Sequence, residues 1–148
     1  DGEPGGTAGK PILDVLTGED IHDSVIVVTR YFGGTLLGTG GLVRAYSGAA
    51  KEGLLASAII TRKRGIKLKI RTEYTGLGKI QYILAQNGIH ILDTRYTEAV
   101  SMECLIPYRE NGKMEKELTE ETNGQAKLEW GEECFFAVHK GETMLFEK

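Results

Sequence analysis

Two glycine-rich stretches hold the residues whose types and spacing could do chemistry. Residues 1–13 are DGEPGGTAGKPIL and residues 28–45 are VTRYFGGTLLGTGGLVRA, and each has a basic residue in or just beyond its glycines. Such stretches have three uses: a cradle of backbone N–H groups for phosphate, a catalytic loop, or a set of tight turns. The residues that flank the glycines help to separate these uses.

Neither stretch matches a nucleotide-binding motif. In GGTAGKP, Pro4 stands where a P-loop has its first glycine, and Pro11 replaces the Ser or Thr that would bind magnesium. We also expect that a lysine followed by proline prevents a normal helix start there, and that no strand precedes it. In GTGGLV, Val43 occupies the position of the last glycine of a dinucleotide fingerprint. The sequence therefore argues against a nucleotide site of either kind.

The sequence also lacks a recognisable nucleophile or metal cluster. His22, His90 and His139 fall in different predicted elements, and none neighbours a cysteine or serine in a known motif. Cys104 and Cys134 are predicted to be small core residues, and no His, Cys and Asp residues have metal-ligand spacing. We therefore expect no catalytic residue, no metal and no cofactor.

The first stretch also carries acidic residues. Asp1 and Glu3 could act as an acid and a base, but two carboxylates in a glycine-rich loop more often cap turns or pair with an arginine. Arg30, at the end of a predicted strand, is a candidate partner. Together with Thr7, these two acids are the candidate residues of a small-molecule pocket.

The second stretch precedes a predicted helix, and this placement favours an anion site. Thr39 is the expected N-cap, followed by two glycines that leave backbone N–H groups accessible, and such groups attract anions. Arg30 and Arg44 are expected to flank this spot, and Lys51 lies seven residues after Arg44, on the same side of the helix. The alternative is that the glycines only permit tight turns. The candidate nucleic-acid- or anion-binding residues are Lys10, Arg30, Thr39, Gly40, Gly41, Arg44 and Lys51.

Charge is distributed unevenly along the 148 residues, although the net charge is only −3. Residues 30–71 hold nine bases and one acid, whereas the segments on both sides are acidic. Such a basic block favours an anionic partner. A solvated helix face joined to a basic linker would also explain it.

Hydrophobic patterns predict the elements that position these residues. Residues 24–31, SVIVVTRY, are predicted to form a buried strand, and a helix follows from Leu42 with an apolar stripe that ends at Ile60. Residues 61–65 are predicted to be a basic linker, with the domain boundary at 62–65. Beyond it we predict strands at 66–72, 89–96, 99–106 and 126–138, with helices at 76–87 and 109–122. This order, βαββαβ, is the ferredoxin-like unit, whose sheet has the strand order 4-1-3-2.

The predicted topology bears on the two cysteines and on the location of the protein. Cys104 and Cys134 fall on the third and fourth strands with the first strand between them, roughly 9–10 Å apart, which is too far for a disulfide. Reduced thiols favour the cytoplasm. No apolar run approaches the roughly 20 residues that cross a bilayer, so no membrane partner is expected.

The same glycine-rich residues carry a family signature. The words DGEP, TAGKP, RYFGG and GLVRAY occur in order, and residues 1–60 resemble the IMPACT family, specifically its bacterial YigZ-like branch. Residues 66–138 resemble the ferredoxin-like domain that follows in bacterial members. The resemblance implies two α+β domains: residues 1–63, similar to the second half of a domain of the ribosomal-protein-S5 domain-2 type whose front is missing, and residues 66–148.

The resemblance also implies a role in translation. The domain pairing is similar to the last two domains of the translocating elongation factor, which contact ribosomal RNA, and eukaryotic relatives are associated with translational control. We therefore expect a non-enzymatic protein that binds RNA or the ribosome through phosphate contacts of the first domain. Two alternatives stay open: an enzyme or binding protein for a phosphorylated small molecule at the glycine-rich loops, and an adaptor that binds a protein through its second domain.

Overall fold

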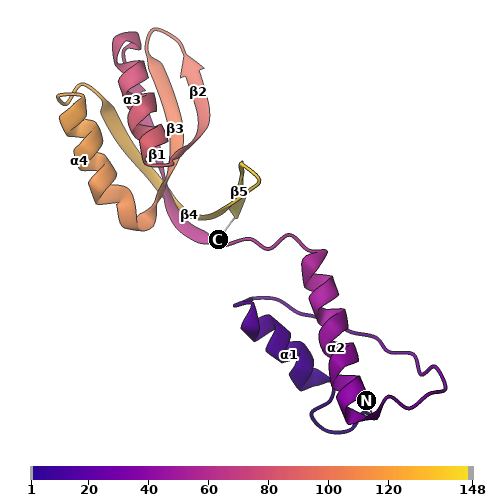
Figure 1. Ribbon diagram of the computed structural model, residues 1–148. Coiled ribbons are helices and arrows are strands. Elements are labelled where there is room, and N and C mark those ends of the chain that lie inside the picture. Colours follow the sequence, from indigo (N-terminus) through magenta and orange to yellow (C-terminus); the bar gives the residue numbers. More distant parts are fainter. Residues whose placement is uncertain (1, 147–148) are drawn as a thin grey trace. The chain divides into compact units, whose positions relative to one another are not determined.

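A computed structural model describes residues 2–146 of the chain, which divides into two compact units, Asp1–Ile59 and Ile60–Lys148 (Figure 1). The architecture is α+β, as predicted. No helix within residues 2–146 is both long enough and apolar enough to cross a membrane.

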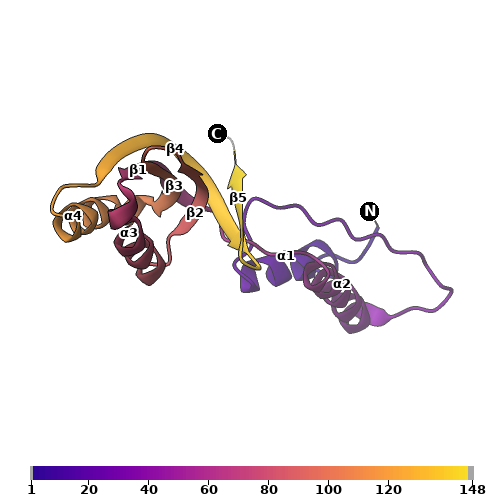
Figure 2. The same cartoon turned by 90° about the horizontal axis from the view of Figure 1, so that it is seen from above.

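The first unit contains two helices, α1 (Gly9–Gly18) and α2 (Gly38–Leu55), which pack side by side (Figure 2). The expectation that the Lys-Pro step prevents a helix was wrong, because α1 begins two residues before Pro11. The N–H groups of the first helical turn have no acceptor within the helix, so proline loses no hydrogen bond there. The buried residues of the two helices are Pro11, Val15, Leu42, Tyr46 and Ala50.

Helix α2 starts and packs differently from the prediction. Leu37 precedes the helix and Thr39 lies inside its first turn, so Thr39 is not the N-cap. The buried side turns one residue away from the predicted stripe after Tyr46, because Ala50 is buried and Ala49 is exposed.

Residues 24–31 are extended but form no strand. Val25, Val27 and Tyr31 are 85%, 82% and 89% exposed, whereas residues 26 and 28 are half-buried. The alternation from residue 25 to 28 is that of a strand. Within the described residues, however, the backbone of this segment has no hydrogen-bond partner. A strand requires such a partner, so the predicted strand is absent from the described residues of this unit.

The second unit is an antiparallel sheet with two helices on one face. Its strands occur in the spatial order β2-β3-β1-β4-β5, which contains the predicted order 4-1-3-2. The fifth strand was not predicted; it forms a hairpin with β4 through Lys140 and Gly141, which have φ values of 49° and 80° and therefore suit a two-residue hairpin turn. The elements are β1 (Lys63–Thr72), α3 (Tyr74–Gln86), β2 (His90–Tyr96), β3 (Val100–Pro107), the 3-10 turn η1 (Tyr108–Glu110), α4 (Asn111–Glu121), β4 (Lys127–His139) and β5 (Glu142–Phe146).

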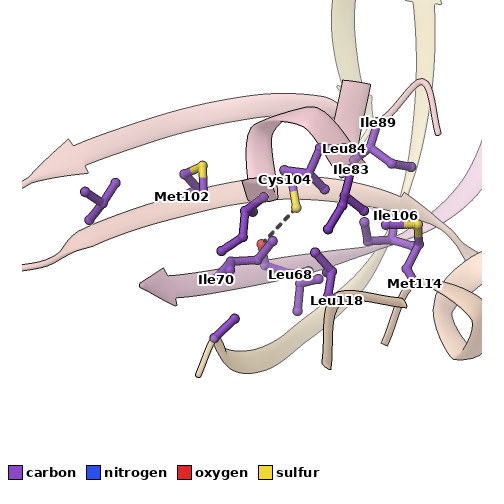
Figure 3. Packing of buried hydrophobic residues seen from close by; sticks show 13 residues of the cluster. Leu68, Ile70, Ile83, Leu84, Ile89, Met102, Cys104, Ile106, Met114 and Leu118 are labelled. Atoms are coloured by element: carbon purple, nitrogen blue, oxygen red, sulfur yellow. Dashed lines mark hydrogen bonds between the residues drawn. The ribbon is translucent and has the colours of Figure 1, made fainter. Parts of the chain in front are cut away.

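The core of the second unit lies between the sheet and helices α3 and α4 (Figure 3). Along β1, Leu68 and Ile70 are buried and point to the helices, whereas Lys67, Lys69 and Arg71 alternate with them and face the other side. Cys104 lies opposite Leu68 and donates a long hydrogen bond from Sγ to its carbonyl oxygen at 3.4 Å. The helices therefore leave the second sheet face open, and this face is strongly polar on β1.

The two cysteines are free thiols on strands that flank β1. Cys104 is buried, whereas Cys134 is only half-buried. Burial raises the pKa of the Cys104 thiol from 9.0 to about 12. The neutral thiol is therefore its resting form, which suits a core residue and not a nucleophile.

Candidate anion-binding site

Glu3 forms an ion pair with Arg30, and Tyr46 of α2 adds a hydrogen bond to Glu3. The Arg30 guanidinium donates to Glu3, and the Tyr46 hydroxyl donates to Glu3 Oε1 at 3.0 Å. The hydrogen bond that Arg30 donates to Glu3 is the main cause that lowers the pKa of Glu3, and the same hydrogen bond is the main cause that raises the pKa of Arg30. Glu3 therefore stays ionised and cannot serve as a general acid.

This cluster confirms the predicted partnership between Glu3 and Arg30. It also removes Arg30 from the predicted anion site. The Arg30 and Glu3 side chains are 25% and 16% exposed, and each already has its counter-ion. Tyr46 is buried, and burial raises the pKa of its hydroxyl. Arg30 is thus used to fix the first glycine-rich stretch beside α2, and Tyr46 contributes its hydroxyl to the same cluster.

The first glycine-rich stretch folds as a set of turns. Gly2 and Gly6 have φ values of 80° and 77°, which favour glycine. Thr7 is buried, and both its hydroxyl and its N–H donate to the carbonyl oxygen of Pro4, at 2.6 and 3.2 Å. Thr7 therefore stabilises the turn before α1 and does not line an open pocket. Asp1, the other candidate pocket residue, lies outside the described residues.

Two cations on α2 have no acidic partner among the residues that the structure describes. Arg44 and Lys51 are exposed, and within residues 2–146 neither has a carboxylate within 4 Å. One terminal nitrogen of Arg44 lies 3.6 Å from the position that a Cβ of Gly40 would occupy, so its guanidinium folds back over the first turn of α2. Thr39 and Gly40 are exposed there, and Gly41 is half-buried against Leu37. A cation and exposed backbone therefore occur together at the start of α2.

A shallow groove between α1 and α2 brings Lys10 and Lys51 into one site. The groove has a volume of about 480 Å³, and its lining includes Ser47 and Glu19. Lys10 is paired with Asp14 of its own helix at 3.0 Å, with both side chains largely exposed. Exposed pairs of this kind are weak, about 0.3–0.5 kcal/mol, so a stronger anion can compete for Lys10.

The structure thus separates the seven predicted anion-site residues into three sets. Thr39, Gly40, Gly41, Arg44 and Lys51 lie along one helix, Lys10 of α1 lines the same groove as Lys51, and Arg30 is held by Glu3. No group of three His, Cys, Asp or Glu residues in the described part of the chain could hold a metal ion.

Sequence reasoning missed a second basic feature, on the open face of the sheet of the second unit. A hollow there is lined by side chains of β1, β2, β3 and β4. The alternation of Lys67, Lys69 and Arg71 signals an exposed basic strand face. The partners of that face come from the register of three other strands, which periodicity does not give.

Comparisons with known proteins agree with the division of the chain into two units. Residues 1–54 match the Impact N-terminal domain, and residues 70–125 match a domain of unknown function, DUF1949. An "IMPACT family member in pol 5'region" of Thermus thermophilus is 32% identical over 130 residues, which cover 87% of this chain and 72% of that relative.

The chain belongs to the IMPACT family.

Other members of the IMPACT family extend the comparison and confirm the predicted resemblance. The chain is 40% identical over 132 residues to the IMPACT family member YvyE of Bacillus subtilis and 34% identical over 128 residues to YigZ of Escherichia coli. These matches cover 89% and 86% of the chain but only 61% and 63% of the relatives. A crystal structure of "an hypothetical protein" is 33% identical, with a TM-score of 0.45, over 86% of this chain and 62% of that one.

Proposed function

We propose that this IMPACT family chain is a non-enzymatic protein of the cytoplasm that binds RNA or the ribosome and takes part in the regulation of translation. The observation that carries the proposal is the pair of cations on α2: Arg44 and Lys51 are exposed and free of carboxylates in the described residues. Seven residues is two helical turns, so the two side chains lie on one side of α2, about 10.5 Å apart along its axis.

That arrangement suits a phosphate backbone. Arginine binds phosphate oxygens through two parallel N–H donors, and lysine binds them as a point charge. The Ser47 hydroxyl lies between the two cations along the helix but donates to the Val43 carbonyl oxygen at 2.7 Å. The proposed contacts are to charged phosphate groups and not to bases. The affinity should therefore depend on salt concentration and only weakly on the RNA sequence.

The alternative of a small-molecule enzyme has less support. Its candidate pocket needs Glu3 and Arg30 as free polar groups, but the two neutralise each other. Burial keeps the Cys104 thiol protonated, and His22 is exposed and pairs with Asp20 at 2.9 Å. No described residue therefore forms a nucleophile–base pair.

Equilibrium binding to a structured RNA tests the proposal. We expect the Arg44→Glu/Lys51→Glu double variant to bind at least about tenfold more weakly, because two attractions become repulsions. The matched control is Arg109→Glu/Lys116→Glu in the second unit, which makes the same charge change on exposed residues. Equal weakening in both variants would mean that only net charge matters, and unchanged affinity of the α2 variant would reject the proposed site.

A further inference from the structure

The open face of the second unit carries a row of cations that crosses four strands. In the antiparallel register, Arg95 of β2 lies opposite Ser101 of β3, Ser101 lies opposite Arg71 of β1, and Arg71 lies opposite Lys127 of β4. Directly paired residues of a sheet point to the same face. Because adjacent strands are about 4.8 Å apart, three positive charges and one hydroxyl share a row about 14 Å long.

Two of the three charges in this row, those of Arg71 and Lys127, have no carboxylate partner in the described residues. Arg71 and Lys127 are both exposed and directly opposite each other, and within residues 2–146 neither has a carboxylate within 4 Å. Like charges in opposite positions of a sheet are destabilising. This unrelieved repulsion would be offset by an anion bound between them.

The third cation is already held in place. Arg95 donates from Nε to Asp93 Oδ2 at 3.1 Å on its own strand. That bond uses one of the five N–H donors of the guanidinium and leaves its two terminal nitrogens for another acceptor. Asp93 therefore orients Arg95 and still leaves the row with donors to spare.

The surface around the row is hollowed, which gives an anion room to enter. The row residues line a depression of about 480 Å³, together with Lys69, Glu103 and Glu129 of the next row along the strands. The next row has three acids, Asp93, Glu103 and Glu129, and one base, Lys69, in register. The positive row is therefore bordered by a negative one about 6.8 Å away, two residues along each strand.

This charge pattern selects the class of ligand. The three cations carry more positive charge than one carboxylate ligand can neutralise. A dianionic phosphoryl group carries two negative charges and offers three oxygens to the two arginines and the hydroxyl. The negative row would repel a polyanion that extends along the strands. No aromatic ring belongs to the described lining of the hollow, so the site offers no base stacking.

We propose that the row Arg95–Ser101–Arg71–Lys127 on the open sheet face binds the phosphoryl group of a small phosphomonoester. The phosphoryl group would lie over Ser101, between the two arginines, with Lys127 at its outer side. The site lies wholly within the second unit and uses none of the residues of the proposed RNA contacts.

Amide chemical shifts of the full ¹⁵N-labelled chain, titrated with glycerol 3-phosphate at constant ionic strength, test this site. We expect saturable shifts at Arg71, Ser101 and Lys127, no shifts with glycerol, and binding about tenfold weaker or more in Arg71→Gln/Lys127→Gln. The matched control, Arg109→Gln/Lys116→Gln, should bind as the unmodified chain does, and so should Arg44→Gln/Lys51→Gln. The same spectra report whether each variant is folded.

Three results would overturn the proposal. Shifts that grow linearly without saturation would show only ion-atmosphere effects, and equal weakening in the control variant would show only net charge. Tighter binding at the same amides by a single-stranded oligoribonucleotide without a terminal phosphate would assign the row to a phosphodiester chain instead. The Arg44→Gln/Lys51→Gln variant keeps the two proposals separate, since it should lose RNA affinity and retain the phosphomonoester.

Discussion

Replacing Cys104 by alanine should change how the stability of the second unit depends on pH. Burial raises the pKa of this thiol from its ordinary 9.0 to about 12 in the folded chain, and the charge of Glu103 adds to the shift. Above pH 9 the unfolded chain releases the proton and the folded chain keeps it. The stability associated with the neutral thiol is therefore fully present below about pH 9 and is lost as the pH rises toward 12.

The magnitude follows from the shift. Each pH unit above 9 costs about 1.4 kcal/mol of unfolding free energy, so the loss by pH 10.5 is on the order of 2 kcal/mol. Cys104→Ala removes the titrating group and also some packing, but the packing loss is the same at every pH. The difference in stability between the unmodified chain and the variant should therefore shrink by about 2 kcal/mol from pH 7.5 to pH 10.5.

Urea unfolding with a reductant present measures this difference. Trp130 is the one tryptophan of the sequence and packs against the core of the second unit, so its fluorescence reports on that unit. Cys134→Ala is the matched control, and its effect should be smaller because Cys134 is only half-buried. If the stability difference stays constant from pH 7.5 to 10.5, Cys104 titrates alike in both states and the burial argument fails.

Three further predictions concern packing, backbone pairing and the Glu3 cluster. Leu118→Ala should cost about 2–5 kcal/mol because Leu118 is a fully buried residue of α4 in the core, whereas Leu55→Ala, at an 86% exposed site, should cost little; equal urea midpoints would contradict this. Amide protons of residues 24–31 should exchange within the fastest class, since their backbone has no partner in the described residues, and strong protection in exchange measured by NMR would refute it. Glu3→Gln should lower the pKa of the Tyr46 hydroxyl, because the Glu3 charge helps to raise it; an unchanged titration of labelled tyrosine would show that the contact is not formed.

The second unit was predicted well because the apolar faces of its helices and strands are clear in the sequence and bury one another. The apolar residues of β1 alternate, those of α3 and α4 repeat at helical spacing, and the resulting faces bury each other. The strand order followed from the order of elements alone. Only β5 was missed, since a five-residue strand beside a two-residue turn carries little periodic signal.

The first unit was predicted less well, for two physical reasons. A β-branched run such as residues 24–31 forms a strand only where another backbone accepts its hydrogen bonds, and the described residues supply none. The Lys10–Pro11 step was treated as a helix breaker, although proline is tolerated in the first turn.

The candidate site was predicted in part. The pairing of Glu3 with Arg30 was among the expectations and is present, because the Glu3 side chain is only 16% exposed and a largely buried carboxylate needs a counter-ion. The same pairing withdraws Arg30 from the predicted anion site, a consequence that charge counting along the chain does not reveal. The row across β2, β3, β1 and β4 depends on strand register, so residues such as Arg95 and Lys127 are brought together only by the fold.

The salt dependence of RNA binding tests the proposed function most directly. For each phosphate that a variant no longer neutralises, the slope of log affinity against log salt should become shallower by about 0.7–0.9. Arg44→Gln/Lys51→Gln should therefore reduce the slope by about 1.4–1.8, and Arg109→Gln/Lys116→Gln should leave it unchanged. A slope that is the same in both variants and in the unmodified chain would contradict the claim that α2 binds phosphate.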